Sequence, residues 1–89
     1  MENNNVVKGD FSWALKEIKE GNKVCRVGWN GKGMFVMLML TPPTTSFNEG
    51  DKQYGFLPYI QMKTVDDKMV PWLASQTDIL AEDWMPAAV

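Results

Sequence analysis

The chain has 89 residues, of which 45% are hydrophobic and 22% charged, with a formal net charge of -2 and no histidine. This composition is typical of a folded globular protein, and the length supports one domain with a modest core, which gains stability from oligomerisation. The negative charge disfavours a broad basic surface and therefore duplex nucleic acid as a partner, although a nucleotide-sized anion can still bind a local pocket.

The N-terminal part of the chain predicts a tail followed by one short helix. Residues 1–9 are polar and rich in asparagine, so we expect a flexible tail, mobile or loosely paired. Asp10 is a candidate helix N-cap, and apolar residues recur at helical spacing from Phe11 to Glu20, until Gly21 ends the pattern. Trp13 lies off this apolar stripe, so it covers a second surface or meets another subunit.

The next segment predicts two strands and a long loop. Residues 23–29 alternate in polarity and precede Asn30-Gly31, a strong signal for a tight hairpin turn. The second strand, 34–40, is apolar at every position, so both of its faces should be covered, one by the helix and one by something else, for which another protomer is a candidate. Residues 41–56 contain Pro42-Pro43 and Asn48-Glu49-Gly50 and predict a long loop, of a length that is often functional.

The C-terminal third predicts a second hairpin and a short closing segment. Strands are expected at 58–64 and 69–73, joined by a turn at Asp66-Asp67. Beyond them, Ser75 or Thr77 is a candidate cap for a helical turn over 78–81. A short edge strand over 83–85, ended by Pro86, closes the chain.

This order of elements predicts an α+β fold in which a short N-terminal helix packs on a small antiparallel β-sheet. No repeat, linker or composition change divides the chain, so residues 1–89 are expected to form a single ligand-binding domain.

Most catalytic chemistry is disfavoured by the residue types present. Without histidine there is no histidine base, no catalytic triad of the usual kind and no histidine-bound metal. The single cysteine, Cys25, can form neither an intrachain disulfide nor a zinc site, and it is better interpreted as a small buried hydrophobe than as a nucleophile. The adjacent acids Asp66-Asp67 and Glu82-Asp83 can in principle pair or bind a cation, but acids on a turn or an edge are usually solvated. We therefore expect a non-enzymatic protein that uses no metal or cofactor.

No segment indicates export or membrane insertion. The N-terminus lacks the basic stretch and apolar run of a secretory signal, and no later run reaches membrane-spanning length. With one cysteine, the expected location is a reducing cytoplasm.

The four tryptophans indicate binding. Trp84, beside the C-terminal edge, is the first candidate for ordinary core, whereas Trp29 precedes a turn and Trp72 leaves a strand into a polar segment. Two indoles at the rim of a sheet, with amides and Arg26 nearby, suit an adenine-containing ligand, although two structural tryptophans are a close alternative. The glycines at 28, 31 and 33 do not have the spacing of a phosphate-binding loop or of a dinucleotide fingerprint, and favour a tight turn.

Several segments together match a known pattern, and the block from Val70 to Trp84 is the most specific of them. The others are Phe11-Ser12-Trp13-Ala14-Leu15, Gly21, Arg26-Val27-Gly28-Trp29-Asn30-Gly31 and Pro58-Tyr59-Ile60-Gln61-Met62-Lys63-Thr64. In these segments the chain resembles the phage Thoeris anti-defence family, second type. The resemblance implies a sponge that sequesters, without altering it, the cyclic ADP-ribose isomer (glycocyclic ADP-ribose) made by the Thoeris TIR protein, so that the NADase effector is not activated.

The resemblance also implies a homo-oligomer, tetrameric in family members, in the cytoplasm of the bacterial host, with ligand pockets between protomers. On matching positions, Trp29 and Trp72 would stack on adenine or face the ribose, Phe11 would close the apolar wall, and Arg26 would pair with the diphosphate. Neutral hydrogen bonds would come from Asn30, Thr64, Ser75 and Gln76, and Asp78 would accept from ribose hydroxyls.

For two of these residues a structural role competes: a helix cap for Asp78 and a surface strand position for Arg26. An enzyme that degrades the signal and an inhibitor that binds a host defence protein through Trp13 remain the alternative functions.

Overall fold

The computed structural model describes residues 9–29, 33–40 and 46–88. The predictions for tail residues 1–8, for Asn30-Gly31 and for loop residues 41–45 therefore lie outside the described residues. Gly9, assigned to the tail, pairs with Trp84 in an isolated β-bridge, with Gly9 N donating to the Trp84 carbonyl at 2.7 Å.

Helix α1 (Phe11–Lys19) confirms the predicted helix and its cap. The Asp10 side chain accepts a hydrogen bond from Trp13 N at 3.0 Å, which satisfies one of the free amides of the first turn. Ala14 and Ile18 lie one helical turn apart and are fully buried. Gly21 follows the helix with a φ of +90°, a conformation that glycine adopts readily.

Trp13 covers a second surface of its own protomer. A methyl group at Gly9 would lie 2.9 Å from the Trp13 side chain, so the indole packs directly on the Gly9 backbone. Trp13 is partly buried and also contacts the core cluster.

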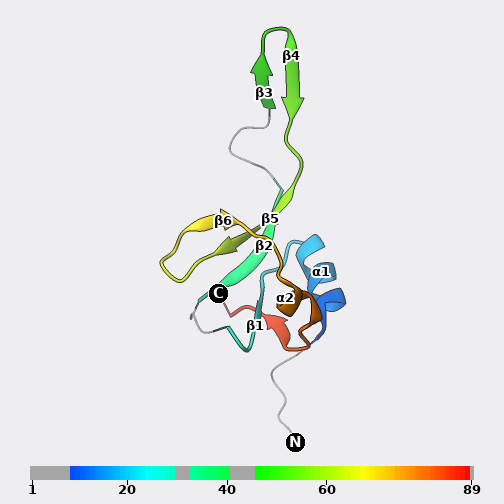
Figure 1. Ribbon diagram of the computed structural model, residues 1–89, viewed down its shortest axis with the longest axis vertical. Coiled ribbons are helices and arrows are strands. Elements are labelled where there is room, and N and C mark those ends of the chain that lie inside the picture. Colours follow the sequence, from blue (N-terminus) through cyan, green and yellow to red (C-terminus); the bar gives the residue numbers. More distant parts are fainter. Residues whose placement is uncertain (1–8, 30–32, 41–45, 89) are drawn as a thin grey trace, which may run out of the picture.

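Five strands form one antiparallel sheet in the order β6-β5-β2-β1-β7 (Figure 1). Their bounds are β1 Val24–Arg26, β2 Phe35–Met39, β5 Tyr59–Lys63, β6 Met69–Pro71 and β7 Trp84–Pro86. Helix α1 packs against one face, where Val24 lies opposite Val36 and both side chains are fully buried with those of Ala14, Ile18 and Trp84. The α+β fold with an N-terminal helix on an antiparallel sheet is confirmed.

Strands β1 and β2 form the predicted antiparallel pair, with Val24 opposite Val36. Strand β1 ends at Arg26, earlier than predicted, and the Gly28 amide donates to the Asp83 side chain.

Strand β2 is covered on both faces only at its start. Phe35 and Val36 are buried, whereas Leu40, predicted to be the covered end of this strand, is 63% exposed. On the face away from α1, Phe35 lies opposite Lys63, and Lys23 Nζ sits 5.0 Å from the centre of the Phe35 ring.

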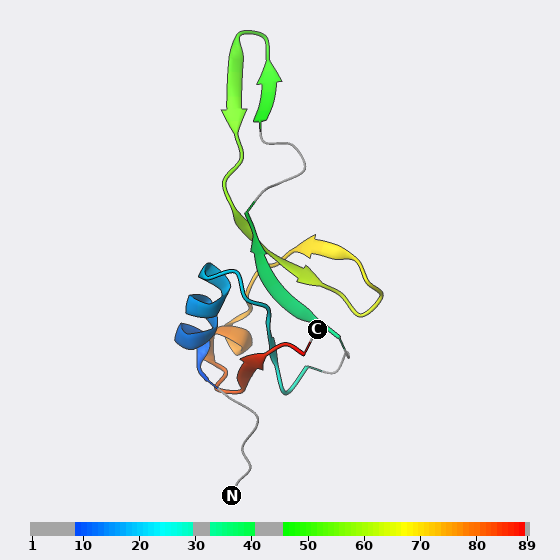
Figure 2. The ribbon, with the colours of Figure 1, turned by 180° about the vertical axis from the view of Figure 1, so that it is seen from behind.

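The predicted long loop over 41–56 is wrong for its second half. Strands β3 (Ser46–Glu49) and β4 (Lys52–Gly55) form a separate two-stranded hairpin that projects away from the five-stranded sheet (Figures 1 and 2). Glu49 pairs with Lys52 across a two-residue turn, and Gly50 takes a φ of +60° there. Phe47 and Tyr54 are cross-strand partners with ring centres 6.2 Å apart, which supplies the side-chain pairing that such a hairpin needs.

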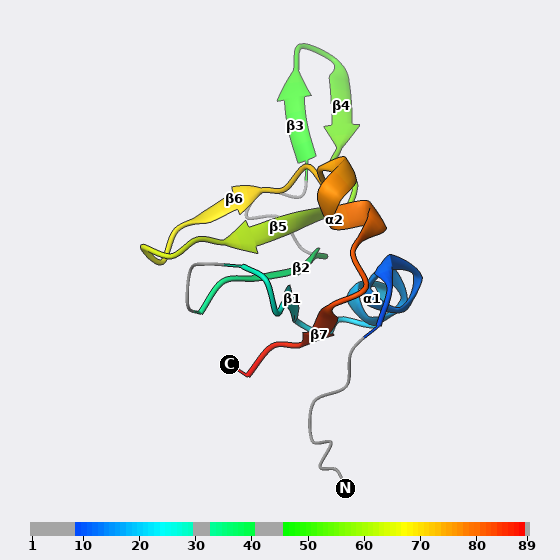
Figure 3. The same cartoon turned by 60° about the horizontal axis from the view of Figure 1, so that its bottom comes forward.

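The C-terminal elements follow the prediction closely. Helix α2 (Gln76–Leu80) begins after Ser75, contacts α1 and precedes the edge strand β7 (Figure 3). Strand β6 ends at Pro71 rather than at Leu73, although Trp72 N still donates to the Ile60 carbonyl at 3.0 Å. Neither helix among the described residues has the length and apolar character needed to cross a membrane.

Candidate functional site

Trp84 is the centre of an aromatic cluster. Its indole is fully buried, which confirms its predicted place in the core, and its Nε1 donates to the Asp78 carbonyl at 2.9 Å. Trp29 and Trp72 meet it edge-on, with ring centres at 5.4 and 6.0 Å, and Phe11 lies at 5.6 Å. Edge-to-face contacts at these distances are favourable for aromatic pairs.

The three outer rings of this cluster are only partly buried. Phe11, Trp29 and Trp72 each pack against the core and retain exposed surface, and Phe11 and Trp72 also contact each other at 6.2 Å. They come from α1, from the turn after β1 and from the segment after β6. The fold thus gathers three of the residues predicted from sequence around one buried indole.

Arg26 lies between two carboxylates beside this cluster. Its Nη1 donates to Asp78 Oδ1 at 2.9 Å and its Nε to Asp83 Oδ1 at 2.8 Å. The exposed fractions of the three side chains are 16% for Arg26, 14% for Asp78 and 29% for Asp83, so the ion pairs are largely shielded from water. Trp29 Nε1 also points to Asp78 Oδ1, at a longer distance of 3.4 Å.

The charges in this cluster shift each other's pKa. Hydrogen bonds to Asp83 and then to Asp78 raise the pKa of Arg26 above its ordinary value. Partial burial acts to raise the pKa of Asp78, but hydrogen bonds from Arg26, Ser75 and Trp29 outweigh it and the pKa is lowered. The pKa of Asp83 is lowered mainly by its hydrogen bond from Arg26. At neutral pH, one cation and two anions leave the cluster with one net negative charge.

These shifts predict a loss of stability in acid. A carboxyl whose pKa is lower in the folded state binds more protons when unfolded, so its contribution is complete above the unfolded value of about 4 and is lost as the pH falls through the folded pKa. The free energy of unfolding, measured in urea at pH 6, 4 and 3, is therefore expected to fall with the pH. Asp83→Asn should flatten this fall, and an unchanged pH dependence in that variant would contradict the assignment.

Ser75 and Gln76 stand at the start of α2. Ser75 Oγ accepts from Asp78 N at 3.0 Å and Asp78 Oδ2 accepts from Ser75 N at 3.4 Å, which forms a capping box. Asp78 therefore serves both as part of the cap and as a partner of Arg26. Gln76 is the exposed first residue of the helix.

Two of the predicted site residues do not join this group. Thr64 belongs to the turn after β5, where its Oγ1 donates to Asp66 Oδ1 at 2.6 Å and accepts from Lys68 N at 3.0 Å. This turn points away from both helices (Figure 3). Asn30 lies outside the described residues. The residues that the fold does bring together are Phe11, Arg26, Trp29, Trp72, Ser75 and Asp78, with Gln76 adjacent.

Asp83 is a member of the cluster that sequence reasoning missed. It was interpreted as a solvated edge acid, whereas both of its carboxylate oxygens accept hydrogen bonds, from Arg26 and from Gly28. Its partners lie more than 50 positions away, so no local spacing could reveal the contact. The only sequence signal is its position next to Trp84.

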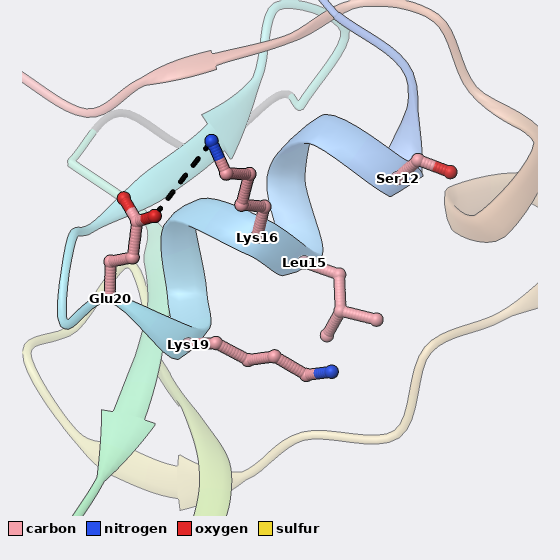
Figure 4. A pocket seen from close by; sticks show the side chains of 5 residues that line it. All are labelled: Ser12, Leu15, Lys16, Lys19 and Glu20. Carbon is pink, nitrogen blue, oxygen red and sulfur yellow. Dashed lines mark ion pairs between the residues drawn. The ribbon is translucent and has the colours of Figure 1, made fainter.

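Most hollows on the described surface lie away from the aromatic cluster and Arg26. One open depression of about 450 Å³ lies on the outer side of α1, lined by Ser12, Leu15, Lys16, Lys19 and Glu20 (Figure 4). Lys16 Nζ and Glu20 Oε2 are 3.9 Å apart at its rim, an ordinary surface ion pair between successive helical turns. A smaller hollow of about 220 Å³ borders Phe11 of the aromatic cluster, between α1 and Ile79 of α2.

Acidic and thiol groups do not converge on a metal position in the described parts of the chain. No group of three or more aspartate, glutamate or cysteine side chains with suitable geometry occurs among residues 9–29, 33–40 and 46–88. The two carboxylates that do approach each other are bridged by Arg26, which occupies the position that a cation would take.

Comparison with known proteins gives two matches. Residues 9–86 match the protein family described as the Thoeris anti-defense 2-like domain, which spans every described helix and strand. The chain is also similar to Thoeris anti-defense 2 of Bacillus phage SP01, with 42% identity over 86 residues that cover 86% of this chain and 92% of the relative.

Proposed function

Since this chain belongs to the Thoeris anti-defense 2 family, we propose that it is a sponge that binds a cyclic ADP-ribose isomer, glycocyclic ADP-ribose, made by the Thoeris TIR protein. Holding that signal in the cytoplasm of the bacterial host would leave the NADase effector inactive. The observation that carries this proposal is the set of partly exposed rings, Phe11, Trp29 and Trp72, around buried Trp84.

The rings suit an adenine-containing ligand. An aromatic side chain that is fixed by the core loses little freedom on binding, and base stacking on such a ring contributes roughly 1 to 3 kcal/mol. Trp29 and Trp72 are both fixed in this way by edge contacts with Trp84. We propose that they stack on the adenine or face the ribose, and that Phe11 forms the apolar wall between them.

The polar side of the site suits hydroxyl groups better than phosphate. Asp78 and Asp83 accept from Nη1 and Nε of Arg26, so a diphosphate would meet the remaining N–H groups in a cluster that is already negative. We propose that Arg26 contacts the diphosphate only through the N–H groups that the two carboxylates leave, on Nη2 and Nη1, and acts mainly by holding Asp78. Asp78 would then accept from ribose hydroxyls, with Ser75 and Gln76 beside it at the start of α2.

Binding without chemistry is consistent with the state of these carboxylates. Both have a lowered pKa, so at neutral pH they remain ionised and have no proton to donate to a leaving group. Each oxygen of Asp83 also already accepts a hydrogen bond, from Arg26 and from Gly28. This argues against the alternative of an enzyme that degrades the signal.

A second protomer is proposed to complete the pocket. The hollow beside Phe11 measures about 220 Å³, below the roughly 300 to 1,000 Å³ of a typical small-molecule site. Enclosure between protomers, in a tetramer, would bury more of the ligand and slow its release, which a stoichiometric sponge requires.

The proposal is tested by recovering the ligand. Purified protein is incubated with the products of the TIR enzyme, filtered and heat-denatured, and the released molecule is identified by mass spectrometry. Intact cyclic ADP-ribose isomer is expected. Recovery of linear ADP-ribose would instead indicate an enzyme, and an undepleted filtrate would indicate an inhibitor that binds a host protein.

Replacing Trp72 by alanine is expected to lower the affinity for the cyclic isomer by about 10-fold to 100-fold, since one stacking surface is lost. Trp72→Phe is the matched control, because it keeps an aromatic contact with Trp84 and should bind more tightly than the alanine variant. Calorimetry is done at a temperature where circular dichroism shows both variants folded. Equal binding by Trp72→Ala and the wild type would remove Trp72 from the site.

A further inference from the structure

Asp83 holds the short segment that carries Trp29. Besides its ion pair with Arg26, Asp83 Oδ2 accepts from Gly28 N at 2.9 Å and the Asp83 carbonyl accepts from Val27 N at 3.0 Å. Resting on the proposed function, we infer that Asp83 is a positioning residue for the ligand site, which acts on the ligand through the Arg26–Trp29 segment rather than by contact.

The backbone contacts fix where β1 ends. Arg26 pairs with Trp84 in the ladder, and the bond from Val27 N to the Asp83 carbonyl extends that ladder by one residue. The chain then turns, with Trp29 N donating to the Arg26 carbonyl at 3.2 Å. The Asp83 side chain closes this turn from outside, because it binds the Arg26 guanidinium and the Gly28 amide at once.

Gly28 fits this arrangement because it has no side chain. A Cβ there would lie 3.0 Å from Asp83 Oδ2 and 3.6 Å from Arg26 Nη2. The first distance is shorter than an ordinary carbon–oxygen contact, so any larger residue would push the carboxylate away from the amide that it binds.

Trp29 depends on this turn for its orientation. Its other fixed contacts are the edge contact with Trp84 and the hydrogen bond to Asp78, which at 3.4 Å is long for an N–H···O bond. These two contacts hold the ring once it is in place, whereas the backbone turn sets the point from which the side chain starts. Asp83 is also the most exposed of the three side chains Arg26, Asp78 and Asp83. Its removal is therefore expected to change the position of the Trp29 ring more than the stability of the fold.

The side-chain chemistry requires a carboxylate. Both oxygens face N–H donors, Arg26 Nε and Gly28 N. In Asp83→Asn one oxygen becomes an amide NH₂ group, which places a donor against a donor on one of the two sides. The substitution keeps the size of the side chain and removes one of its two hydrogen bonds.

The test compares Asp83→Asn and Gly28→Ala with Asp67→Asn, a matched control. Asp67 is a carboxylate that is 80% exposed and paired with Lys63 in the distant turn after β5. Affinity for the purified cyclic ADP-ribose isomer is measured by calorimetry at a temperature where all variants are folded. We expect at least a tenfold loss in both cluster variants and none in the control. The double variant should bind no more weakly than the worse single one, because both changes break the same contact.

Near-ultraviolet circular dichroism without ligand gives a second readout. Asp83→Asn should change the tryptophan signal of the wild type but not that of a Trp29→Phe background. If the wild type fails to bind the isomer, the proposed function is wrong, and this spectral comparison still decides whether Asp83 positions Trp29. Wild-type affinity in Asp83→Asn, or a spectral change that persists without Trp29, would overturn the inference and leave Asp83 a purely structural ion-pair partner.

Discussion

Replacing Trp84 by alanine is expected to destabilise the protein by about 3 to 5 kcal/mol, the range for removing a buried large aromatic side chain. The indole is fully buried, contacts the rings of Phe11, Trp29 and Trp72, and donates a hydrogen bond to the Asp78 carbonyl. A chain of 89 residues has a total stability of only about 4 to 13 kcal/mol. The variant should therefore lose a large share of its free energy of unfolding, as measured by urea denaturation followed by circular dichroism.

Tyr54→Ala serves as the control for this result. Tyr54 is a half-exposed aromatic residue in the projecting β3–β4 hairpin, whose only ring partner among the described aromatic contacts is Phe47. Its removal should cost less than about 1.5 kcal/mol, the upper value for an aromatic pair. Similar losses in the two variants would mean that the Trp84 cluster is not the centre of stability.

Arg26→Met is the second change with a large expected effect. It removes the cation between Asp78 and Asp83 and leaves two partly buried carboxylates unpaired. A fully buried pair that loses one partner costs roughly 3 to 5 kcal/mol, and because these carboxylates retain some exposure we expect about 2 to 3 kcal/mol at pH 7. The measurement is again the free energy of unfolding in urea.

The pH dependence separates this mechanism from a simple loss of packing. Without the guanidinium, the two neighbouring carboxylates repel each other and favour protonation in the folded state, which raises their pKa above the unfolded value. The stability of Arg26→Met should then rise as the pH falls from 7 towards 4, a range over which these carboxylates leave the stability of the wild type unchanged. Addition of Asp83→Asn to this variant should recover part of the loss at pH 7. A variant that loses stability in acid as the wild type does would refute the proposed role of Arg26.

Local signals in the sequence predicted the elements that are determined locally. The cap at Asp10, the apolar spacing of α1 and the stop at Gly21 all lie within a few residues of one another, and the structure confirms them. The same holds for the Ser75 cap of α2 and the edge strand at Trp84.

The errors had two causes, a contact with a distant residue and a local turn that was misinterpreted. Strand β1 was expected to reach Trp29 but ends at Arg26, and the amide of Gly28 is bound by the side chain of the distant Asp83. The hairpin of β3 and β4 was hidden because its Gly50 turn was interpreted as part of a long loop, while its aromatic pair, Phe47 and Tyr54, lies seven positions apart.

The candidate site was predictable in its residue types and not in its geometry. Aromatic residues next to amides and acids indicated a flat ligand, and the fold does gather Phe11, Trp29 and Trp72. The sequence could not show that Arg26 is already bound by two carboxylates, since its partners come from α2 and from the residue before β7. The resemblance assigned Thr64 to the ligand site, but its hydroxyl forms the hydrogen bonds that close the turn after β5.

The position of Trp84 beneath the outer rings has a consequence for how this protein can evolve. Its indole supports both the hydrophobic core and the two tryptophans proposed to touch the ligand. A substitution at the centre of the cluster therefore changes abundance and recognition together, and selection cannot adjust one without the other. Divergence in ligand preference is expected to accumulate at exposed positions of the rim such as Gln76, where a new side chain disturbs no buried neighbour.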